Sequence, residues 1–419
     1  MTSREDPGAP VPSRAEGQAQ PLDGSTSRQA QGPELSRRAS SPSDSTELVA
    51  GRAEPRGWLG AGRVESRGVL RIAEFLCSCT ALIIAIIGLA QLDLPIIRYV
   101  RSVTIHLPWD QLIVPWMAFT SNWGDWIGEG SHLIVVSLAL LAAGWIISRP
   151  AFISAGIQTL LAQGIAALLS NGLKHLIGRP RPKFVHSGEW QFTPSWASGL
   201  DSFPSGHATA SFAVATVLAK RFPAFGPLCL SLAAFVALSR VLRGAHFPTD
   251  VVGGAVLGVL SGSIASAPLK QWSTSLQDGL RHAAVGTCAV FALLWTLTHR
   301  VDEGIAGALM VGLGAVAAAS GLWLRRARWI DKTNSIKGWQ ANASLALIAY
   351  GLAAMTTSPL VLASVGFACL ASCFNGILAS DGPVQDSRAW LMMREGALLG
   401  GVLLALLILY GGRGVLPFQ

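Results

Sequence analysis

Apolar stretches long enough to cross a lipid bilayer recur along most of this 419-residue chain. A membrane-spanning helix needs about 20 consecutive residues that are mostly apolar. Only 13% of the residues are charged, whereas a soluble globular domain carries about 25%. The chain is therefore predicted to be an all-α, polytopic transmembrane helix bundle and not an ordinary soluble enzyme. We place eleven apolar stretches, at residues 70–92, 131–148, 151–173, 207–220, 223–243, 249–267, 283–299, 304–324, 341–357, 359–379 and 396–412.

Two parts of this assignment stay open. The stretches 207–220 and 283–299 are short for a span, so the count of eleven could change by one or two. Residues 94–124 mix tryptophans with charged and apolar residues, a pattern typical of helices that lie in the membrane interface. We expect interfacial helices there and not a twelfth span.

The N-terminal segment differs in composition from the rest of the chain. Residues 1–66 are rich in Ser, Pro, Gly, Gln, Arg and Glu, so they cannot bury enough apolar surface to offset the entropy lost on ordering. We expect a disordered N-terminal tail. A secretory signal is not predicted, because its apolar region would lie within about the first 30 residues and the first apolar run begins near Leu70.

The net charge of +8 is interpreted first as a sign of membrane topology and only then as a sign of binding partners. In a membrane protein an excess of Lys and Arg first marks the cytoplasmic loops, so no nucleic-acid partner is expected. With a cytoplasmic N-terminus, one group of basic residues falls in cytoplasmic connections: Arg63, Arg67, Arg71, Arg149, Lys220, Arg221, Lys270, Arg281, Arg325, Arg326, Arg328, Lys332 and Lys337. A second group falls on the opposite face, against this rule, and needs another explanation: Lys174, Arg179, Arg181, Lys183, Arg240 and Arg243.

The six cysteines all lie in apolar stretches. At such positions a cysteine is expected to act as a small buried apolar residue. No histidine accompanies them at the spacing of a zinc site. We predict no metal site.

Ionisable residues inside apolar spans are costly and indicate functional sites. Here they gather in three blocks, at residues 174–182, 204–207 and 239–250. The first block ends the third span, the second opens the fourth, and the third joins the fifth to the sixth. Because the fourth and fifth spans make one round trip across the membrane, the three blocks are expected to lie on one face.

The first block carries two cations suited to phosphate. Lys174 and Arg181 lie about two helical turns apart, so both can face the same way until Gly178 and Pro180 end the helix. Arginine offers a planar fork that matches phosphate oxygens, and lysine offers a compact positive charge.

Two helix N-termini are expected to face the same place. Ser205 is a good N-cap, and Gly206, with no Cβ, lets the backbone approach an anion at the positive end of the fourth span. Pro248 is typical of a first helical turn, so the sixth span would begin just after His246. The blocks together predict an anion site that contains two histidines.

The histidines and a carboxylate predict covalent catalysis. His246 and Asp250 are four residues apart, so Asp250 could accept the Nδ1 proton and leave Nε2 as a nucleophile. His207 would be the general acid that protonates the leaving oxygen. Arg240 and the two cations of the first block would stabilise the transition state, a role that needs no metal or other cofactor.

These residues resemble the complete three-part signature of the type-2 phosphatidic acid phosphatase and vanadium haloperoxidase superfamily: Lys-x6-Arg-Pro, Pro-Ser-Gly-His and Ser-Arg-x5-His-x3-Asp. All of its fixed positions are present, in order, as Lys174, Arg181, Pro182, Pro204, Ser205, Gly206, His207, Ser239, Arg240, His246 and Asp250. The resemblance covers roughly residues 70–267. It implies a six-span helical core, a phosphohistidine on His246, acid catalysis by His207 and orientation by Asp250. It also implies phosphate binding by Lys174, Arg181, Ser205, Gly206 and Arg240.

Two arginines lie within the blocks at positions that the signature leaves variable. Arg179 and Arg243 are candidates for contact with a second phosphate or a lipid headgroup. The chain is thus divided into a tail over residues 1–66, a phosphatase core over 67–268, and an extension of about five spans over 269–419. The sequence predicts no role for the extension.

The leading hypothesis is a membrane lipid phosphatase of the bacterial inner membrane, with its active site facing the periplasm. Its partners would be the bilayer and a phosphorylated lipid, and no protein partner is predicted. A phosphotransferase would begin with the same half-reaction. A haloperoxidase, or a transporter or scaffold without catalysis, is disfavoured by the many spans and the intact catalytic positions. The motifs bind only phosphate, so undecaprenyl diphosphate, phosphatidylglycerol phosphate, phosphatidic acid and lipid A 1-phosphate all remain open.

Overall fold

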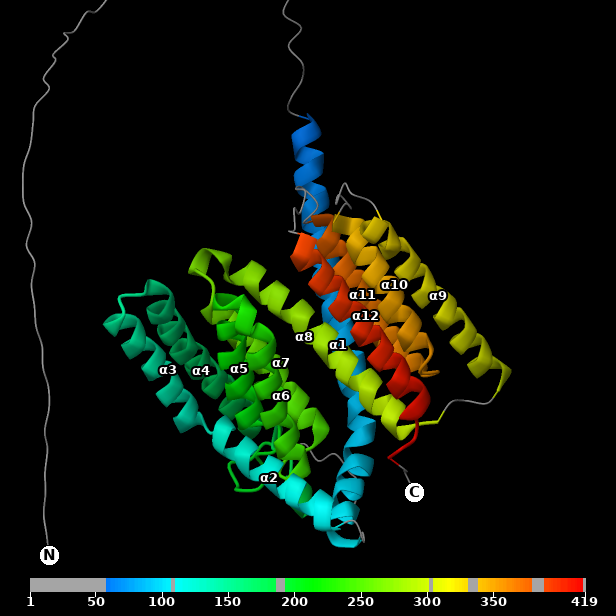
Figure 1. Cartoon of the computed structure of the whole chain (residues 1–419). Coiled ribbons are helices and arrows are strands. Elements are labelled where there is room, and N and C mark those ends of the chain that lie inside the picture. Colours follow the sequence, from blue (N-terminus) through cyan, green and yellow to red (C-terminus); the bar gives the residue numbers. More distant parts are fainter. Residues whose placement is uncertain are drawn as a thin grey trace, which may run out of the picture. The chain divides into compact units, whose positions relative to one another are not determined.

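The computed structural model describes residues 58–106, 110–185, 193–300, 304–330, 338–378 and 388–416, and the regular elements in these ranges are all helices. The predicted tail lies outside the described residues up to residue 57. The helices are α1 (Trp58–His106), α2 (Asp110–Gly128), α3 (Gly130–Ile146), α4 (Pro150–Ile177), α5 (Gly206–Arg221), α6 (Gly226–Leu242), α7 (Pro248–Ala265), α8 (Trp272–Thr298), α9 (Ile305–Ile330), α10 (Gly338–Ala354), α11 (Pro359–Leu378) and α12 (Arg388–Gly411), shown in Figure 1. Short 3-10 turns occur at Pro182–Phe184, Pro223–Phe225 and Leu269–Gln271.

The prediction of an all-α polytopic bundle is confirmed over the described residues. Among these, eight helices are long and apolar enough to cross a membrane, or nine if α2 and α3, which meet at a bend of 53°, form one broken span. When α2 and α3 count as one span, this is two fewer than eleven, a change that the prediction allowed for, and the helices left out of the count are α5 and α10, with 16 and 17 residues. The short stretch 283–299, in contrast, is part of the 27-residue helix α8.

The predicted interfacial segment at residues 94–124 is wrong in its first half. Helix α1 runs through Pro95 to His106 without a break. The reason is packing: Ile96, Ile97 and Val100 recur at helical spacing and are buried. Helix α1 also begins at Trp58, inside the segment predicted as a tail.

Glycines set the distance between α5 and α7, the two helices that carry the second and third blocks. Gly254, Gly258 and Gly262 recur every four residues on α7, and a Cβ on any of them would lie within about 2.6 Å of a backbone oxygen of α5 or of its N-cap, Ser205. Only glycine permits so close an approach. The N-terminus of α5 is thereby held directly beside that of α7.

Helix α1 packs against both the predicted core and the predicted extension. It contacts α7 as well as α8 and α11 (Figure 1). Ala81, Ala85 and Leu89 of α1 are fully buried in one cluster with Phe291 of α8 and Val361 of α11. The extension therefore shares a hydrophobic core with the first helix of the chain.

The extension contains a buried ion pair. Arg325 of α9 donates from Nε and Nη2 to the two carboxylate oxygens of Glu395 on α12, at 2.7 and 2.5 Å. Its Nη1 donates to Ser344 of α10 at 3.2 Å. Arg325 therefore lies within α9, near its C-terminal end, and its side chain is 5% exposed and held by a partner 70 residues away; its place on the cytoplasmic side stays a prediction.

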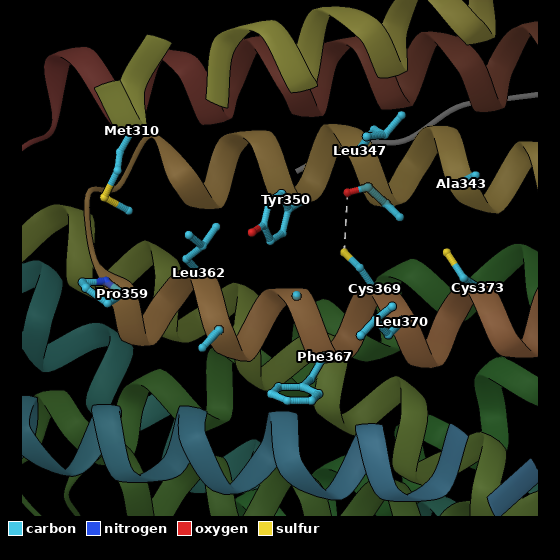
Figure 2. Close-up of a pocket in the computed structure, with 13 residues that line it drawn as sticks. Met310, Ala343, Leu347, Tyr350, Pro359, Leu362, Phe367, Cys369, Leu370 and Cys373 are labelled. Atoms are coloured by element: carbon cyan, nitrogen blue, oxygen red, sulfur yellow. Dashed lines mark hydrogen bonds between the residues drawn. The ribbon is translucent and has the colours of Figure 1, made fainter. Parts of the chain in front are cut away.

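A cavity of about 850 Å³ lies beside α10 and α11 in the extension. Met310, Tyr350, Leu362 and Phe367 are among the residues that line it (Figure 2). Its lining is apolar apart from the Tyr350 hydroxyl and the thiols of two cysteines. Phosphate chemistry therefore has no cationic group to use here.

Candidate phosphate-binding active site

The three blocks meet at one end of α4 to α7. Ser205 donates its backbone N–H to the carbonyl of Asp250 at 2.9 Å, which ties the start of α5 to the start of α7. The Ser202 N–H donates to the carbonyl of Arg179 at 3.0 Å, which ties the loop after α4 to the same place. These backbone hydrogen bonds bring the three blocks into direct contact, in agreement with the predicted grouping.

His246 is held by a backbone carbonyl. Its Nδ1 lies 2.8 Å from the Ser202 carbonyl and 3.7 Å from the nearer oxygen of Asp250. The Ser202 carbonyl is the nearer partner of Nδ1, and Asp250, which was predicted to accept this proton, lies within ion-pair distance of it. A carbonyl can only accept, so Nδ1 carries the proton and Nε2 keeps its lone pair. The side chain is 3% exposed.

Asp250 is instead the centre of a buried network. It accepts hydrogen bonds from the Ser202 hydroxyl at 2.5 Å and the Phe247 N–H at 2.9 Å, and it forms an ion pair with Arg179. The Phe247 contact caps the first turn of α7, which begins at Pro248 as the sequence predicts. Asp250 therefore supports His246 both by its own contact with Nδ1 and by fixing Ser202 and the start of α7.

Arg179 does not face a headgroup position. Its side chain is 3% exposed and donates to Asp250, to Thr249 at 2.7 Å and to Asp93 of α1 at 2.7 Å. Its guanidinium also lies 4.2 Å from the centre of the Phe247 ring. The prediction of a headgroup contact at Arg179 is wrong, because these interactions use the guanidinium to hold α1, the loop after α4 and the start of α7 together.

Lys174 precedes Gly178, the C-cap of α4, and Arg181 follows it. Gly178 adopts the left-handed conformation, with φ 61°, and ends α4 as predicted. The Lys174 ammonium lies 3.5 Å from the position that a Cβ on Gly206 would take, so it sits at the N-terminus of α5. Arg181 donates from Nε and Nη2 to Asp201 at 2.8 and 2.6 Å. These hydrogen bonds hold the pKa of Asp201 below its ordinary value.

The second histidine and two arginines converge on one carboxylate. Asp125 of α2 forms ion pairs with Arg240 and Arg243 of α6, and its Oδ1 lies 3.3 Å from Nε2 of His207. Arg240 is buried, whereas 46% of the Arg243 side chain is exposed. Arg243 thus remains placed at the opening of the site, where contact with a headgroup stays a prediction.

The N-terminus of α5 supplies polar groups that have no partner. Ser205 occupies the N-cap position that the sequence predicts, yet its hydroxyl makes no capping hydrogen bond. The buried Ser205 Oγ and the buried Arg240 Nε have no hydrogen-bond partner among the described residues. Buried polar groups normally find partners, so two unpaired groups beside several cations indicate a place for an anion.

The described residues contain no group of three or more His, Cys, Asp or Glu side chains that could hold a metal ion. The six cysteines are unpaired thiols. What the site offers is therefore positive charge, unpaired hydrogen-bond donors and two imidazoles.

Sequence reasoning missed four residues of the site: Asp93, Asp125, Asp201 and Ser202. Asp93 and Asp125 are carboxylates within apolar segments, and such residues indicate functional sites by default. The sequence therefore contained a signal that could have identified both Asp93 and Asp125. Ser202 and Asp201 lie in a loop, where the sequence offers no comparable signal.

Comparison with known proteins places this chain in a family. The sequence profile of the PAP2 superfamily matches residues 155–272, which include all three blocks. A lipid A 1-phosphatase of Rhizobium etli is 35% identical over 146 residues, which cover 31% of this chain and 62% of that protein. The phosphatidylglycerophosphatase B of Bacillus subtilis is 31% identical over 160 residues, which cover 35% of this chain and 72% of that protein.

The matches do not extend along the whole chain. This chain spans less than two thirds of the lipid A 1-phosphatases of Rhizobium etli and Rhizobium johnstonii that it matches, 62% and 39% of their lengths. The crystal structure of a transmembrane PAP2-type phosphatidylglycerolphosphate phosphatase from Bacillus subtilis is 27% identical. The match covers 45% of this chain and 93% of the chain in that crystal structure, with a TM-score of 0.33. The profile match and the Bacillus subtilis relative, of which more than two thirds is covered, establish that this chain belongs to the PAP2 superfamily.

Proposed function

We propose that this chain is an integral membrane phosphatase that removes phosphate from a phosphorylated membrane lipid. The observation that carries the proposal is the set of buried, unpaired donors at Ser205 and Arg240, which lie with Lys174 and Arg181 around two histidines. The relatives named above, a lipid A 1-phosphatase and a phosphatidylglycerophosphatase, support a lipid phosphate as the substrate class.

The first half-reaction would transfer the phosphoryl group to His246. The Nδ1–H group donates a hydrogen bond to the Ser202 carbonyl, so Nε2 keeps its lone pair. This lone pair attacks phosphorus, and a P–N bond forms as the P–O bond to the lipid breaks. His207 gives its proton to the departing oxygen. Arg240 and the N-terminus of α5 stabilise the charge on the phosphoryl oxygens.

The second half-reaction would regenerate the enzyme. Water attacks phosphorus, its proton passes to His207, and the P–N bond breaks to release inorganic phosphate. His246 and His207 then return to their starting states. If a lipid or sugar hydroxyl took the place of water, the same intermediate would give phosphotransfer.

Membrane orientation is part of the proposal. The rule for loop charge supports a cytoplasmic N-terminus and an active site on the periplasmic face of a bacterial inner membrane. A phosphorylated lipid carries its headgroup at the depth where α4 and α6 end. Such a substrate could therefore reach the cluster from the bilayer.

The test is phosphate release by the purified full-length protein. Phosphatidic acid, phosphatidylglycerol phosphate, undecaprenyl diphosphate and lipid A would each be offered in mixed micelles. We expect at least one to be hydrolysed by the wild type, and we expect His246→Ala to lose more than about 10³-fold in kcat. His282→Ala is the matched control, because His282 lies on α8 and bonds only its own helix at Asp278.

Two results would contradict the proposal. One is dephosphorylation that His246→Ala leaves unchanged. The other is a wild type that releases no phosphate from any lipid of the panel while a newly phosphorylated acceptor accumulates, which would indicate phosphotransfer.

A further inference from the structure

Asp125 lies outside the family signature and outside the segment that the family profile matches, yet it contacts two residues of the proposed active site. Its position follows from two glycines on α2. A Cβ on Gly124 would lie 2.2 Å from the Ser239 side chain, and one on Gly128 would lie 2.3 Å from Val236. These glycines let α2 pack directly on α6, so that Asp125 reaches the arginine that follows Ser239.

Asp125 occupies one nitrogen of the Arg240 guanidinium and leaves another available to bind phosphate. Asp125 accepts from Nη1 of Arg240, while Nε of the same guanidinium has no partner among the described residues. An anion bound through Nε would therefore not compete with Asp125 for the same donor. The pairing fixes the guanidinium from one side and leaves another side open.

The same carboxylate faces the general acid. Oδ1 of Asp125 lies 3.3 Å from Nε2 of His207. Burial, together with the positive charges of Arg240 of α6, His246 before α7 and Lys174 of α4, lowers the pKa of His207 to about 4, so each of these opposes a positive charge on the imidazole. Asp125 is the group in this set that favours the protonated form, which a general acid needs.

We propose that Asp125 is a positioning residue that favours the protonated form of His207 and holds Arg240 in place for phosphoryl transfer. This inference rests on the proposed function, because it concerns the acid of that reaction. It predicts that the demand for Asp125 depends on the leaving group. A lipid alkoxide needs a proton as it departs, whereas the phenolate of p-nitrophenyl phosphate does not.

The test compares Asp125→Asn with the wild type on both kinds of substrate. We expect kcat/KM for a lipid phosphate to fall at least about ten-fold, and kcat/KM for p-nitrophenyl phosphate to fall less than about three-fold. Because Asp125 favours the imidazolium, the alkaline limb of the pH profile should move to lower pH by about one unit. Asp125→Glu should restore part of the activity.

Controls separate this inference from the proposed function. Glu129→Gln removes an exposed carboxylate at the bend between α2 and α3, which pairs with His132, and should leave both activities unchanged. A proton NMR titration of the His207 ring, assigned by its loss in His207→Gln, reports the same shift without any turnover. If the wild type hydrolyses no lipid, the proposed function fails, and the titration still decides the inference about Asp125.

Two outcomes would overturn the inference. Equal losses on both substrates, with an unchanged titration of His207, would mean that Asp125 only supports the local fold. A gain in kcat/KM would mean that Asp125 is an internal anion that competes with the substrate phosphate.

Discussion

Two groups of buried charge in this molecule differ in how completely they are paired. In the extension, Arg325 and Glu395 are 5% and 2% exposed and satisfy each other through two hydrogen bonds. In the proposed active site, the donors of Arg240 and Ser205 are incompletely paired, and 35% of the Asp125 side chain is exposed. A buried ion inside a membrane protein is therefore not by itself evidence of a site. Unpaired donors that a ligand can reach are the better indication.

The closed pair should matter most for stability. Arg325→Ala removes the nearer ion-pair partner of the buried Glu395 carboxylate and leaves it with Arg394 at 3.9 Å, and breaking a buried pair costs about 3–5 kcal/mol. We expect a large fall in the unfolding free energy of the detergent-solubilised protein, with unchanged turnover per folded molecule.

The double variant Arg325→Met with Glu395→Leu is the control for that prediction. It removes both charges, so it should recover most of the lost stability. A loss of turnover in the folded fraction of Arg325→Ala would contradict the contrast between the two regions.

The open cluster should behave in the opposite way. Arg240→Ala removes a donor that we propose binds the phosphoryl group, and losing one such donor lowers kcat by about 10²–10³-fold. The melting temperature should change little, because Asp125 is partly exposed and can be hydrated. Arg221→Ala, on an exposed basic residue at the end of α5 that bonds Gln158, is the matched control for activity. Unchanged turnover of Arg240→Ala on every lipid that the wild type hydrolyses would break the comparison.

Arg179 tests whether a buried arginine next to the cluster acts on binding or on chemistry. Arg179→Lys keeps the charge but loses the planar fork that joins Asp93, Thr249 and Asp250. We expect kcat to fall about ten-fold with little change in KM, because the start of α7 and hence His246 lose their support. A rise in KM with unchanged kcat would instead support the hypothesis, made from the sequence alone, that Arg179 contacts the lipid headgroup.

The sequence was sufficient for features that depend on local chemistry. Gly178 ends α4, Ser205 occupies the N-cap of α5 and Pro248 begins α7, each as predicted from residue type. Partners across the fold were not predictable in this way. Arg240 meets Asp125 over 115 residues, and Arg179 meets Asp93 over 86. The sequence shows that these charges exist but not which of them are paired, and pairing is what separates Arg325 from Arg240.

Asp201 should give the smallest effect, because it forms a partly exposed pair. It accepts two hydrogen bonds from Arg181, and the two side chains are 30% and 27% exposed. Such a pair contributes about 0–1 kcal/mol, so phosphate can displace Asp201 at little cost. We expect Asp201→Asn to bind inorganic phosphate about three-fold more tightly, measured as product inhibition. Asp278→Asn, at an exposed carboxylate on α8 that pairs with Arg281, should bind phosphate as the wild type does.

The effect of Asp201 also has a defined dependence on pH. Hydrogen bonds from Arg181 lower the pKa of Asp201 below its ordinary value, so the carboxylate stays ionised from about pH 5 to pH 8. The difference in phosphate affinity between Asp201→Asn and the wild type should therefore be constant across that range. It should shrink only as the pH falls through the lowered pKa, where protonated Asp201 releases Arg181. Weaker phosphate binding in Asp201→Asn would mean that Asp201 orients Arg181 toward the phosphate, and this open pair would then act as a fixed support like the closed one at Arg325.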